Sequence, residues 1–148
     1  MKKEINKAKI SDVYRIEELD KASFDKPWSS VLIEEDMNHE FSNFDLLEVD
    51  DKLVGYINYW LIGDDIELNR ICILPEFRKM GLASSLLDYL VDLAYEKSSD
   101  RVLLEVSADN ENAIRLYDKF DFKDIYVREK YYDDGSDAII KERVTNDM

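Results

Sequence analysis

Residues 70–87, RICILPEFRKMGLASSLL, decide the fold that this sequence predicts. A short apolar run ends at Pro75, a turn containing Arg78 and Gly81 follows, and apolar residues then recur at helical spacing. The stretch therefore predicts a buried strand, a turn and an amphipathic helix. The N–H groups at the start of such a helix favour a phosphate, and Gly81 permits close approach of the backbone. We interpret the turn as a pyrophosphate cradle.

Length and charge limit the possible partners. The 148 residues predict a single domain spanning 1–148, and 20 basic minus 34 acidic residues give a net charge of −14. Nucleic acid is therefore not an expected partner, because phosphate backbones select positive surfaces. A basic protein segment or a polyamine would be attracted instead. Alternatively, the charge serves only solubility.

Cysteine and histidine usage points to a reducing compartment and no metal. Cys72 is the only cysteine, which excludes an intrachain disulfide and fits the cytoplasm. His39 stands alone without a ligand motif, so no metal site is expected. No apolar run suits a signal peptide or a membrane span, and we expect no membrane association.

The order of predicted elements is β-α-α-β-β-β-α-β-α-β-β, which indicates an α/β fold with one mixed sheet and helices on both faces. Expected strands cover residues 4–10, 45–49, 53–62, 66–73, 101–106, 122–132 and 138–144, and expected helices begin near residues 13, 30, 82 and 110. Turns are expected at Asp50–Asp51 and in DDGS, where Gly135 can adopt a positive φ.

Three side chains are candidates for chemistry. Glu105 interrupts the apolar strand RVLLEV, so it either opens onto a cleft as a general base or faces solvent on an outer strand. Tyr117 lies on the apolar stripe of the following helix, where its position by itself favours packing with Ala113 and Phe120. For Cys72 we favour a core role over a covalent mechanism through its thiol, because no histidine lies nearby in the sequence to activate it.

Several separated motifs resemble one family of enzymes. RKMGLA resembles the [R/Q]-x-x-G-x-[G/A] acetyl-CoA signature of the GNAT superfamily of N-acetyltransferases, with Arg78, Gly81 and Ala83 at its defining positions. LEVSADNENAIRLYDKFDF resembles the LEV-x-x-x-N-x-x-A-I-x-L-Y-x-x-x-G-F run of the RimI-like branch, the ribosomal-protein-alanine N-acetyltransferases. FDKPWS and KYYDDGSDAII are similar to two further elements of that branch, and the resemblance covers nearly the whole chain.

The resemblance implies a sheet that splays open centrally, between the strands at residues 68–73 and 102–106, with acetyl-CoA in the gap. It implies that Glu105 deprotonates the substrate, that Tyr117 protonates the departing sulfur and that Asn110 binds the pantetheine arm. The implied acetyl-CoA contacts also include Ile71, Cys72, Ile73, Arg78, Lys79, Met80, Gly81, Leu82 and Ala83. Trp28, Tyr131 and Tyr132 would line the peptide groove, unless they are plain packing residues.

The implied reaction is acetylation of a protein N-terminus, in particular that of a ribosomal protein beginning with Ala. Forming the neutral amine at pH 7 costs about 1.4 kcal/mol for a protonated α-amine and about 4.6 kcal/mol for a protonated lysine. A single carboxylate base can therefore deprotonate an α-amine more easily than a lysine. The alternatives are a small amine or a lysine side chain as acceptor, or a non-catalytic acidic module that binds a basic protein. Two residues depart from the family pattern: Asp121 replaces a helix-terminal Gly, and Arg70 replaces an Asn and would repel a cationic substrate if it faced the groove.

Overall fold

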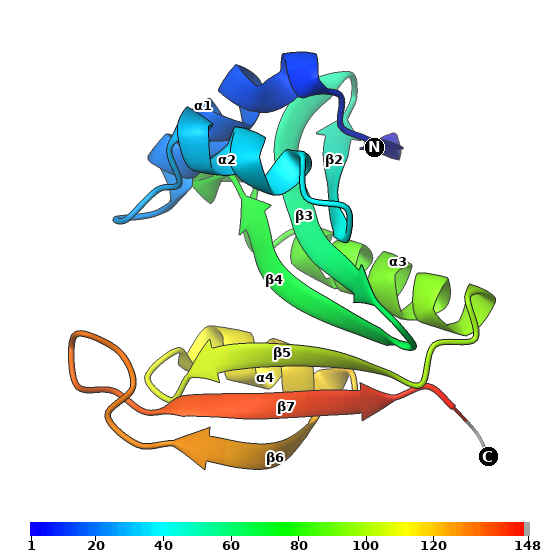
Figure 1. Ribbon diagram of the computed structural model, residues 1–148. Helices are drawn as coiled ribbons and strands as arrows, with labels where there is room; N and C mark the ends of the chain where they lie inside the picture. The colour runs from blue at the N-terminus through cyan, green and yellow to red at the C-terminus, as the bar shows by residue number, and fades with distance from the viewer. Residues whose placement is uncertain (147–148) are drawn as a thin grey trace. The chain divides into compact units, whose positions relative to one another are not determined.

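The computed structural model describes residues 1–146, and its seven strands follow the order β1-β2-β3-β4-β5-β7-β6. The elements are labelled in Figure 1. The strands are β1 Lys3–Lys7, β2 Ser42–Val49, β3 Lys52–Ile62, β4 Asp65–Ile73, β5 Arg101–Ser107, β6 Lys123–Arg128 and β7 Ala138–Val144. The helices are α1 Val13–Ser23, α2 Ser30–Met37, α3 Leu82–Glu96 and α4 Glu111–Lys119, with short 3-10 turns η1 Ile10–Asp12 and η2 Pro75–Phe77. The predicted element order and the α/β class are confirmed.

The chain divides into two compact units. The first contains Met1–Leu61 and Arg70–Leu86, and the second contains Ile62–Asn69 and the chain from Leu87 onward. Strand β4 and helix α3 therefore each contribute to both units.

In the first unit, β1 pairs with β2 and β2 pairs with β3, both antiparallel. Asp50 and Asp51 join β2 to β3 with φ angles of 49° and 67°, which suits a two-residue hairpin turn and confirms the predicted turn. Strand β1 ends earlier than predicted because the Asp12 side chain accepts a hydrogen bond of 2.8 Å from the Lys9 backbone N–H and starts η1.

Helices α1 and α2 lie beside each other in the first unit (Figure 1). Ser29 caps α2, because its side chain accepts a hydrogen bond from the Leu32 N–H at 3.2 Å. The apolar face of α1 packs into a core with β2, β3 and β4. The buried members of this core are Val13, Ile16, Leu19, Ile33, Phe44, Leu46, Tyr56, Cys72 and Leu74.

In the second unit, β7 lies between β5 and β6 and is antiparallel to both (Figure 1). Strand β5 is also parallel to β4, but this ladder covers only four pairs, from Asp65 opposite Arg101 to Leu68 opposite Leu104. The sheet pairing between β4 and β5 therefore ends at Leu104, in the middle of β5. This position lies within the two strand ranges between which the family resemblance implies that the sheet opens.

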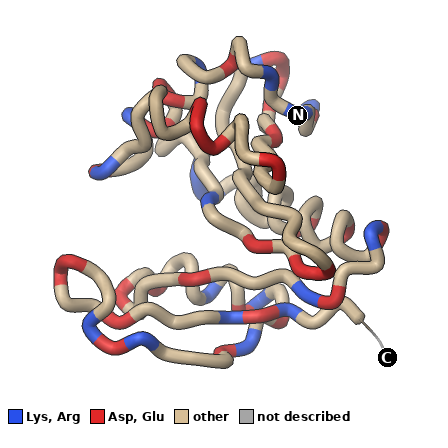
Figure 2. Tube along the Cα trace, in the orientation of Figure 1, with Lys and Arg blue, Asp and Glu red and all other residues tan. Residues whose placement is uncertain are grey.

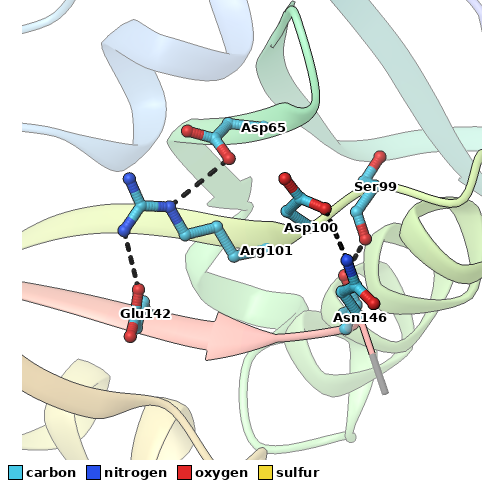
Figure 3. Close-up of polar contacts among 7 residues, drawn as sticks. Asp65, Ser99, Asp100, Arg101, Glu142 and Asn146 are labelled. Atoms are coloured by element: carbon cyan, nitrogen blue, oxygen red, sulfur yellow. Dashed lines mark hydrogen bonds and ion pairs between the residues drawn. The ribbon is translucent and has the colours of Figure 1, made fainter. Parts of the chain in front are cut away.

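Polar contacts fasten the paired end of this ladder (Figure 3). Arg101 places Nε 3.3 Å from Asp65 Oδ1 on β4 and Nη1 2.8 Å from Glu142 Oε2 on β7. Asn146 donates a hydrogen bond of 2.8 Å to the Asp100 carboxylate. Three strands are thus linked where the ladder exists, and none of these contacts extends past Leu104.

Helix α4 ends in a residue with left-handed backbone geometry. Phe120 is its C-cap, and Asp121 follows with a φ of 63°. Glycine adopts this conformation without strain, so Asp121 is a less favourable residue here, as its departure from the family pattern predicts. Gly135 has a φ of 85° in the loop before β7, which confirms the predicted turn.

Acidic residues outnumber basic residues in the sequence, and Figure 2 shows them distributed over both units. No helix of the described residues combines the length and apolarity that a membrane span needs.

Candidate active site

The turn between β4 and α3 has an unusual backbone. Lys79 has a φ of 64° and Gly81 a φ of 78°, while Met80 between them is exposed. A Cβ built on Gly81 would meet no atom within 4 Å. The glycine is therefore needed for its backbone angle, and the space beside its Cα is open. A positive φ at the glycine and open space beside it are the two features that the predicted pyrophosphate cradle needs.

Helix α3 begins directly after this glycine, at Leu82. The first helical bond that closes on the turn runs from the Ser85 N–H to the Gly81 carbonyl at 3.0 Å. The N–H groups before Ser85 belong to the first turn of α3, whose donors find no carbonyl one turn back. Leu82 is buried and anchors the helix, whereas Ala83 is partly exposed and adds little bulk. The turn can bind an anion through its main chain.

Arg78 donates hydrogen bonds to two backbone carbonyls, a structural role that the sequence does not predict. Its Nε donates to the Ile73 carbonyl at 3.1 Å, and its Nη2 donates to the Ser23 carbonyl at 3.0 Å. The guanidinium thus ties the start of the turn to the ends of β4 and α1. Its positive charge stays near the cradle while these donors are engaged by carbonyls.

The end of β4 carries Ile71, Cys72 and Ile73, which the family resemblance assigns to the thioester carbonyl. Cys72 is fully buried in the core, and its Sγ lies 3.8 Å from the Leu19 carbonyl. Burial raises the pKa of the Cys72 thiol to about 11. A neutral, buried thiol is a poor nucleophile, which agrees with the core role favoured from the sequence.

Gly55 is a residue that the sequence analysis overlooked. A Cβ on Gly55 would lie 2.3 Å from the Cys72 carbonyl oxygen, so β3 approaches the backbone of β4 more closely than any side chain permits. A glycine inside the β-rich run LVGYINYW was the available signal. Gly55 therefore helps to set the position of the β4 backbone.

Glu105 lies in β5 of the second unit, flanked by the buried residues Leu104 and Val106. Its side chain is exposed, and it is the first residue of β5 beyond the four-pair ladder with β4. On its other side it pairs with Ile140 of β7. β5 is an interior strand, so the alternative of an outer strand is wrong. Glu105 is an accessible carboxylate where the β4–β5 ladder has ended.

Tyr132 contacts this carboxylate directly. Its hydroxyl donates to Glu105 Oε2 at 3.2 Å, and its ring packs edge-on against Tyr131 at a centroid distance of 5.3 Å. Burial, followed by the negative charge of Glu105, raises the pKa of Tyr132 to about 12. Tyr132 therefore stays protonated and donates to the carboxylate, a closer involvement than the predicted groove lining.

Tyr117 lies on α4, which follows β5, and Asn110 directly precedes this helix. The Tyr117 ring lies 5.8 Å from the ring of the buried Phe122, and burial raises the pKa of Tyr117 to about 12. Asn110 is the N-cap of α4, and its side-chain oxygen accepts from the Ala113 N–H at 3.2 Å. Its amide NH₂ remains as the group with which Asn110 can bind a ligand.

Trp28 lies in the first unit, in the segment between α1 and α2. The Arg70 guanidinium carbon is 4.2 Å from the centroid of the Trp28 ring, and Arg70 Nη1 is 3.6 Å from the buried Asp20 carboxylate. Asp20 is not among the residues that the sequence predicts for the site. Its position four residues after Ile16, on the buried stripe of α1, was the available signal.

The predicted site residues are thus divided between the units. Glu105, Asn110, Tyr117, Tyr131 and Tyr132 belong to the second unit, and the others belong to the first. Within the second unit the fold brings Glu105 into contact with Tyr132. Among residues 1–146, no three histidine, cysteine or acidic side chains gather into a possible metal site.

The fold and these motifs define an acetyltransferase. The model of the acetyltransferase (GNAT) family matches residues 10–122, so the chain belongs to this family. This membership supports acetyltransferase activity, and acetyl-CoA is the co-substrate that acetyltransferases of this family use.

Within the family, the chain resembles enzymes that modify one ribosomal protein. It is 32% identical over 138 residues to a putative [ribosomal protein bS18]-alanine N-acetyltransferase of Bacillus subtilis, covering 92% of this chain and 91% of that protein. It is 30% identical over 117 residues to the [ribosomal protein bS18]-alanine N-acetyltransferase of Escherichia coli, covering 77% and 78%. The crystal structure of the Escherichia coli ribosomal-protein-S18-alanine N-acetyltransferase superposes with a TM-score of 0.92 at 25% identity, covering 99% of this chain and 96% of that one.

Proposed function

We propose that this protein, acting as one domain of residues 1–148, transfers the acetyl group of acetyl-CoA to the N-terminal α-amine of a protein. One observation carries the proposal: Glu105 is an exposed carboxylate on an interior strand, placed where the ladder with β4 has ended and held by the Tyr132 hydroxyl. A base of this kind can take a proton from an ammonium group while a substrate lies against the unpaired edge of β5.

The backbone turn at Gly81 is the proposed holder of the pyrophosphate. Its positive φ and the first-turn N–H groups of α3 supply an anion site without a bulky side chain, together with Lys79, Met80, Leu82 and Ala83. The main-chain amides of Ile71–Ile73 would hold the thioester carbonyl, and the free amide of Asn110 would bind the pantetheine arm. Arg78 contributes by fixing the turn and by its charge.

The proposed reaction is a direct attack within a ternary complex. Glu105 accepts a proton from the substrate ammonium, and the neutral nitrogen then bonds to the thioester carbonyl carbon. The nitrogen of the tetrahedral intermediate loses a second proton as the carbon–sulfur bond breaks. Of the two protons lost by the nitrogen, one is balanced by the proton that the sulfur gains, and the other is released from Glu105 to solvent. The products are an acetylated N-terminus and free coenzyme A, with no covalent intermediate on the protein.

Tyr117 is the proposed donor to the departing sulfur, and its environment defines how it acts. Burial raises its pKa to about 12. Complete transfer of its proton to a thiolate of cysteine-like pKa, ~8.5, would then be uphill by about 5 kcal/mol. We therefore assign Tyr117 the role of a hydrogen-bond donor that stabilises the thiolate, with the final proton arriving through solvent.

The acceptor class follows from charge and from the relatives. The net charge of −14 attracts a basic segment, and two similar proteins are named for acetylating the alanine of ribosomal protein bS18. We propose a ribosomal protein beginning with Ala as the substrate, modified in the cytosol where such proteins are made. The same charge also suits a lysine side chain or a polyamine, which form the second candidate class.

A panel of acceptors tests this proposal. Acetyl-CoA is incubated with a basic peptide starting with Ala, the same peptide blocked at its N-terminus but carrying lysine, and spermidine, and the products are identified by mass spectrometry. We expect acetylation of the free N-terminus. Preferred acetylation of the lysine peptide or spermidine would replace the proposed acceptor, and no acetyl-CoA binding by calorimetry would favour a non-catalytic binding module.

Glu105→Gln tests the site itself. The variant should lower kcat about 100-fold or more, because a positioned base contributes at least that factor, while acetyl-CoA affinity stays unchanged. Glu67→Gln is a matched control, since Glu67 is also an exposed glutamate on a strand, opposite Leu103 in the β4–β5 ladder. Wild-type turnover in Glu105→Gln would remove Glu105 from the mechanism.

A further inference from the structure

Arg70 packs against two aromatic rings of the first unit. Its guanidinium carbon lies 3.9 Å from the centroid of the Phe24 ring and 4.2 Å from that of Trp28. Its side chain is only 16% exposed. A guanidinium can stack on aromatic faces in this way while its edge remains able to donate hydrogen bonds.

Asp20 supplies the opposite charge. This carboxylate is fully buried on α1 and accepts hydrogen bonds from the Tyr56 hydroxyl and from the Trp28 backbone N–H, the latter at 2.9 Å. Its Oδ2 lies 3.6 Å from Arg70 Nη1. Burial and the charge of Asp20 raise the pKa of Tyr56, so Tyr56 remains a donor. A buried carboxylate is stable only with such partners, and Arg70 is the cation among them.

The two aromatic residues that contact Arg70 belong to one short segment, residues 24–29, which connects α1 to α2. Phe24 begins the segment and Trp28 lies near its end, and Arg70 on β4 stacks on both rings. The Trp28 ring also packs edge-on against Phe44, with 6.4 Å between centroids. Arg70 thus joins β4 to both ends of a segment that has no regular secondary structure.

We propose that Arg70 is a positioning residue, which with Asp20 holds the segment 24–29 in its substrate-ready conformation before any acceptor binds. Because the acceptor does not have to order this segment, it binds more tightly. The part that concerns acceptor affinity rests on the proposed function, with Trp28 lining the peptide groove. The part that concerns the order of the segment rests only on the contacts of the first unit.

The same pairing removes the electrostatic objection to Arg70. The resemblance to enzymes with Asn at this position suggested that an arginine would repel a cationic acceptor. Asp20 and Arg70 together carry no net charge, and their separation of 3.6 Å makes the local field that of a dipole. Arg70 is therefore compatible with a basic N-terminus as substrate.

Two substitutions of Arg70 and one control test the proposal. Arg70→Asn removes the charge and both ring contacts, whereas Arg70→Lys keeps the charge that Asp20 needs but loses the flat stacking surface. Arg101→Gln is the control, because Arg101 also contacts two strands but belongs to the second unit, whereas the segment belongs to the first. Hydrogen exchange of the amides in residues 24–30 and steady-state kinetics with the Ala peptide are the two measurements.

We expect the Trp28 amide to exchange about tenfold faster in Arg70→Asn and about threefold faster in Arg70→Lys, with no change in Arg101→Gln. The KM for the peptide should rise about tenfold in Arg70→Asn, while kcat and the KM for acetyl-CoA change by less than about twofold. A merely structural loss would instead lower the active fraction and reduce kcat without this selective change in KM.

Each outcome decides one part of the proposal. Exchange of the segment within about twofold of wild type in both Arg70 variants would overturn the positioning role. Faster exchange with an unchanged peptide KM would overturn the link to acceptor binding. If Arg70→Asn does not fold, Arg70→Lys carries the test. If the wild-type enzyme acetylates no peptide, the proposed function fails while the exchange measurement still tests the positioning role.

Discussion

Replacing Tyr117 by Phe removes one hydroxyl and leaves the ring that packs against Phe122. If the hydroxyl donates a hydrogen bond to the departing thiolate, its loss costs about 1.5–3 kcal/mol, the usual contribution of a hydrogen bond to a charged group. This corresponds to a fall in kcat of about 10- to 150-fold. Acetyl-CoA affinity should not change, because the interaction forms only as the carbon–sulfur bond breaks.

The raised pKa of Tyr117 adds a second expectation. With a pKa of about 12, Tyr117 stays protonated throughout the range in which the enzyme can be assayed. Any loss of activity between about pH 8 and pH 10 must then come from another group, and Tyr117→Phe should show the same pH profile as the wild type, displaced to lower kcat.

Single-turnover kinetics from about pH 6 to pH 10, with calorimetry for acetyl-CoA, measures both quantities. Tyr95→Phe is a matched control, because the Tyr95 hydroxyl accepts a hydrogen bond of 3.3 Å from Arg143 in the same unit but has no proposed role. A kcat of Tyr117→Phe within about threefold of wild type would refute the donor role. If the wild type loses activity between about pH 8 and pH 10 and Tyr117→Phe does not, the interpretation that Tyr117 remains protonated is refuted.

Four further predictions follow from single contacts. Gly55→Ala should lower the free energy of unfolding by about 3 kcal/mol or more in urea titrations, because its Cβ would lie 2.3 Å from a carbonyl oxygen of β4. Asp121→Gly should raise that free energy by about 0.5–1 kcal/mol, since Asp121 has a φ of 63°; no gain would mean that the aspartate is not strained. Tyr132→Phe should lower kcat about 3- to 10-fold by releasing Glu105 from its 3.2 Å hydrogen bond, with acetyl-CoA binding unchanged. Burial alone would lower the pKa of Lys141, but hydrogen bonds to Asp118 and Asp124 raise it above its ordinary value. The charged Lys141 therefore stabilises the fold below about pH 10.5, and this stabilisation is lost as the pH rises further. Lys141→Met should lack this loss of stability in alkaline denaturation curves.

The turn between β4 and α3 is a feature that local sequence determines. Gly81 permits a positive φ, Leu82 starts a helix with apolar residues at helical spacing, and a helix N-terminus presents free N–H groups wherever it occurs. The two-residue turn at Asp50–Asp51 and the left-handed residue Asp121 were predictable for the same reason. In each case the physical cause lies within a few residues along the chain.

The setting of Glu105 could be predicted only in part. The sequence places a carboxylate in an apolar strand and leaves open whether that strand is interior or outer. Strand order and the length of the β4–β5 ladder decide this, and both depend on which strands pair across the sheet. The hydrogen bond from Tyr132 likewise joins two segments that only folding brings together.

The sequence by itself determined the α/β class and the glycine-containing turn before α3, because periodicity and backbone preference act between near neighbours. Only the tertiary structure decided that Asp20 pairs with Arg70 and that Arg70 lies against Phe24 and Trp28. It also decided that the missing side chain of Gly55 allows the β4 backbone to lie close to β3. Burial and close approach are properties of segments distant in the chain, so no local pattern encodes them.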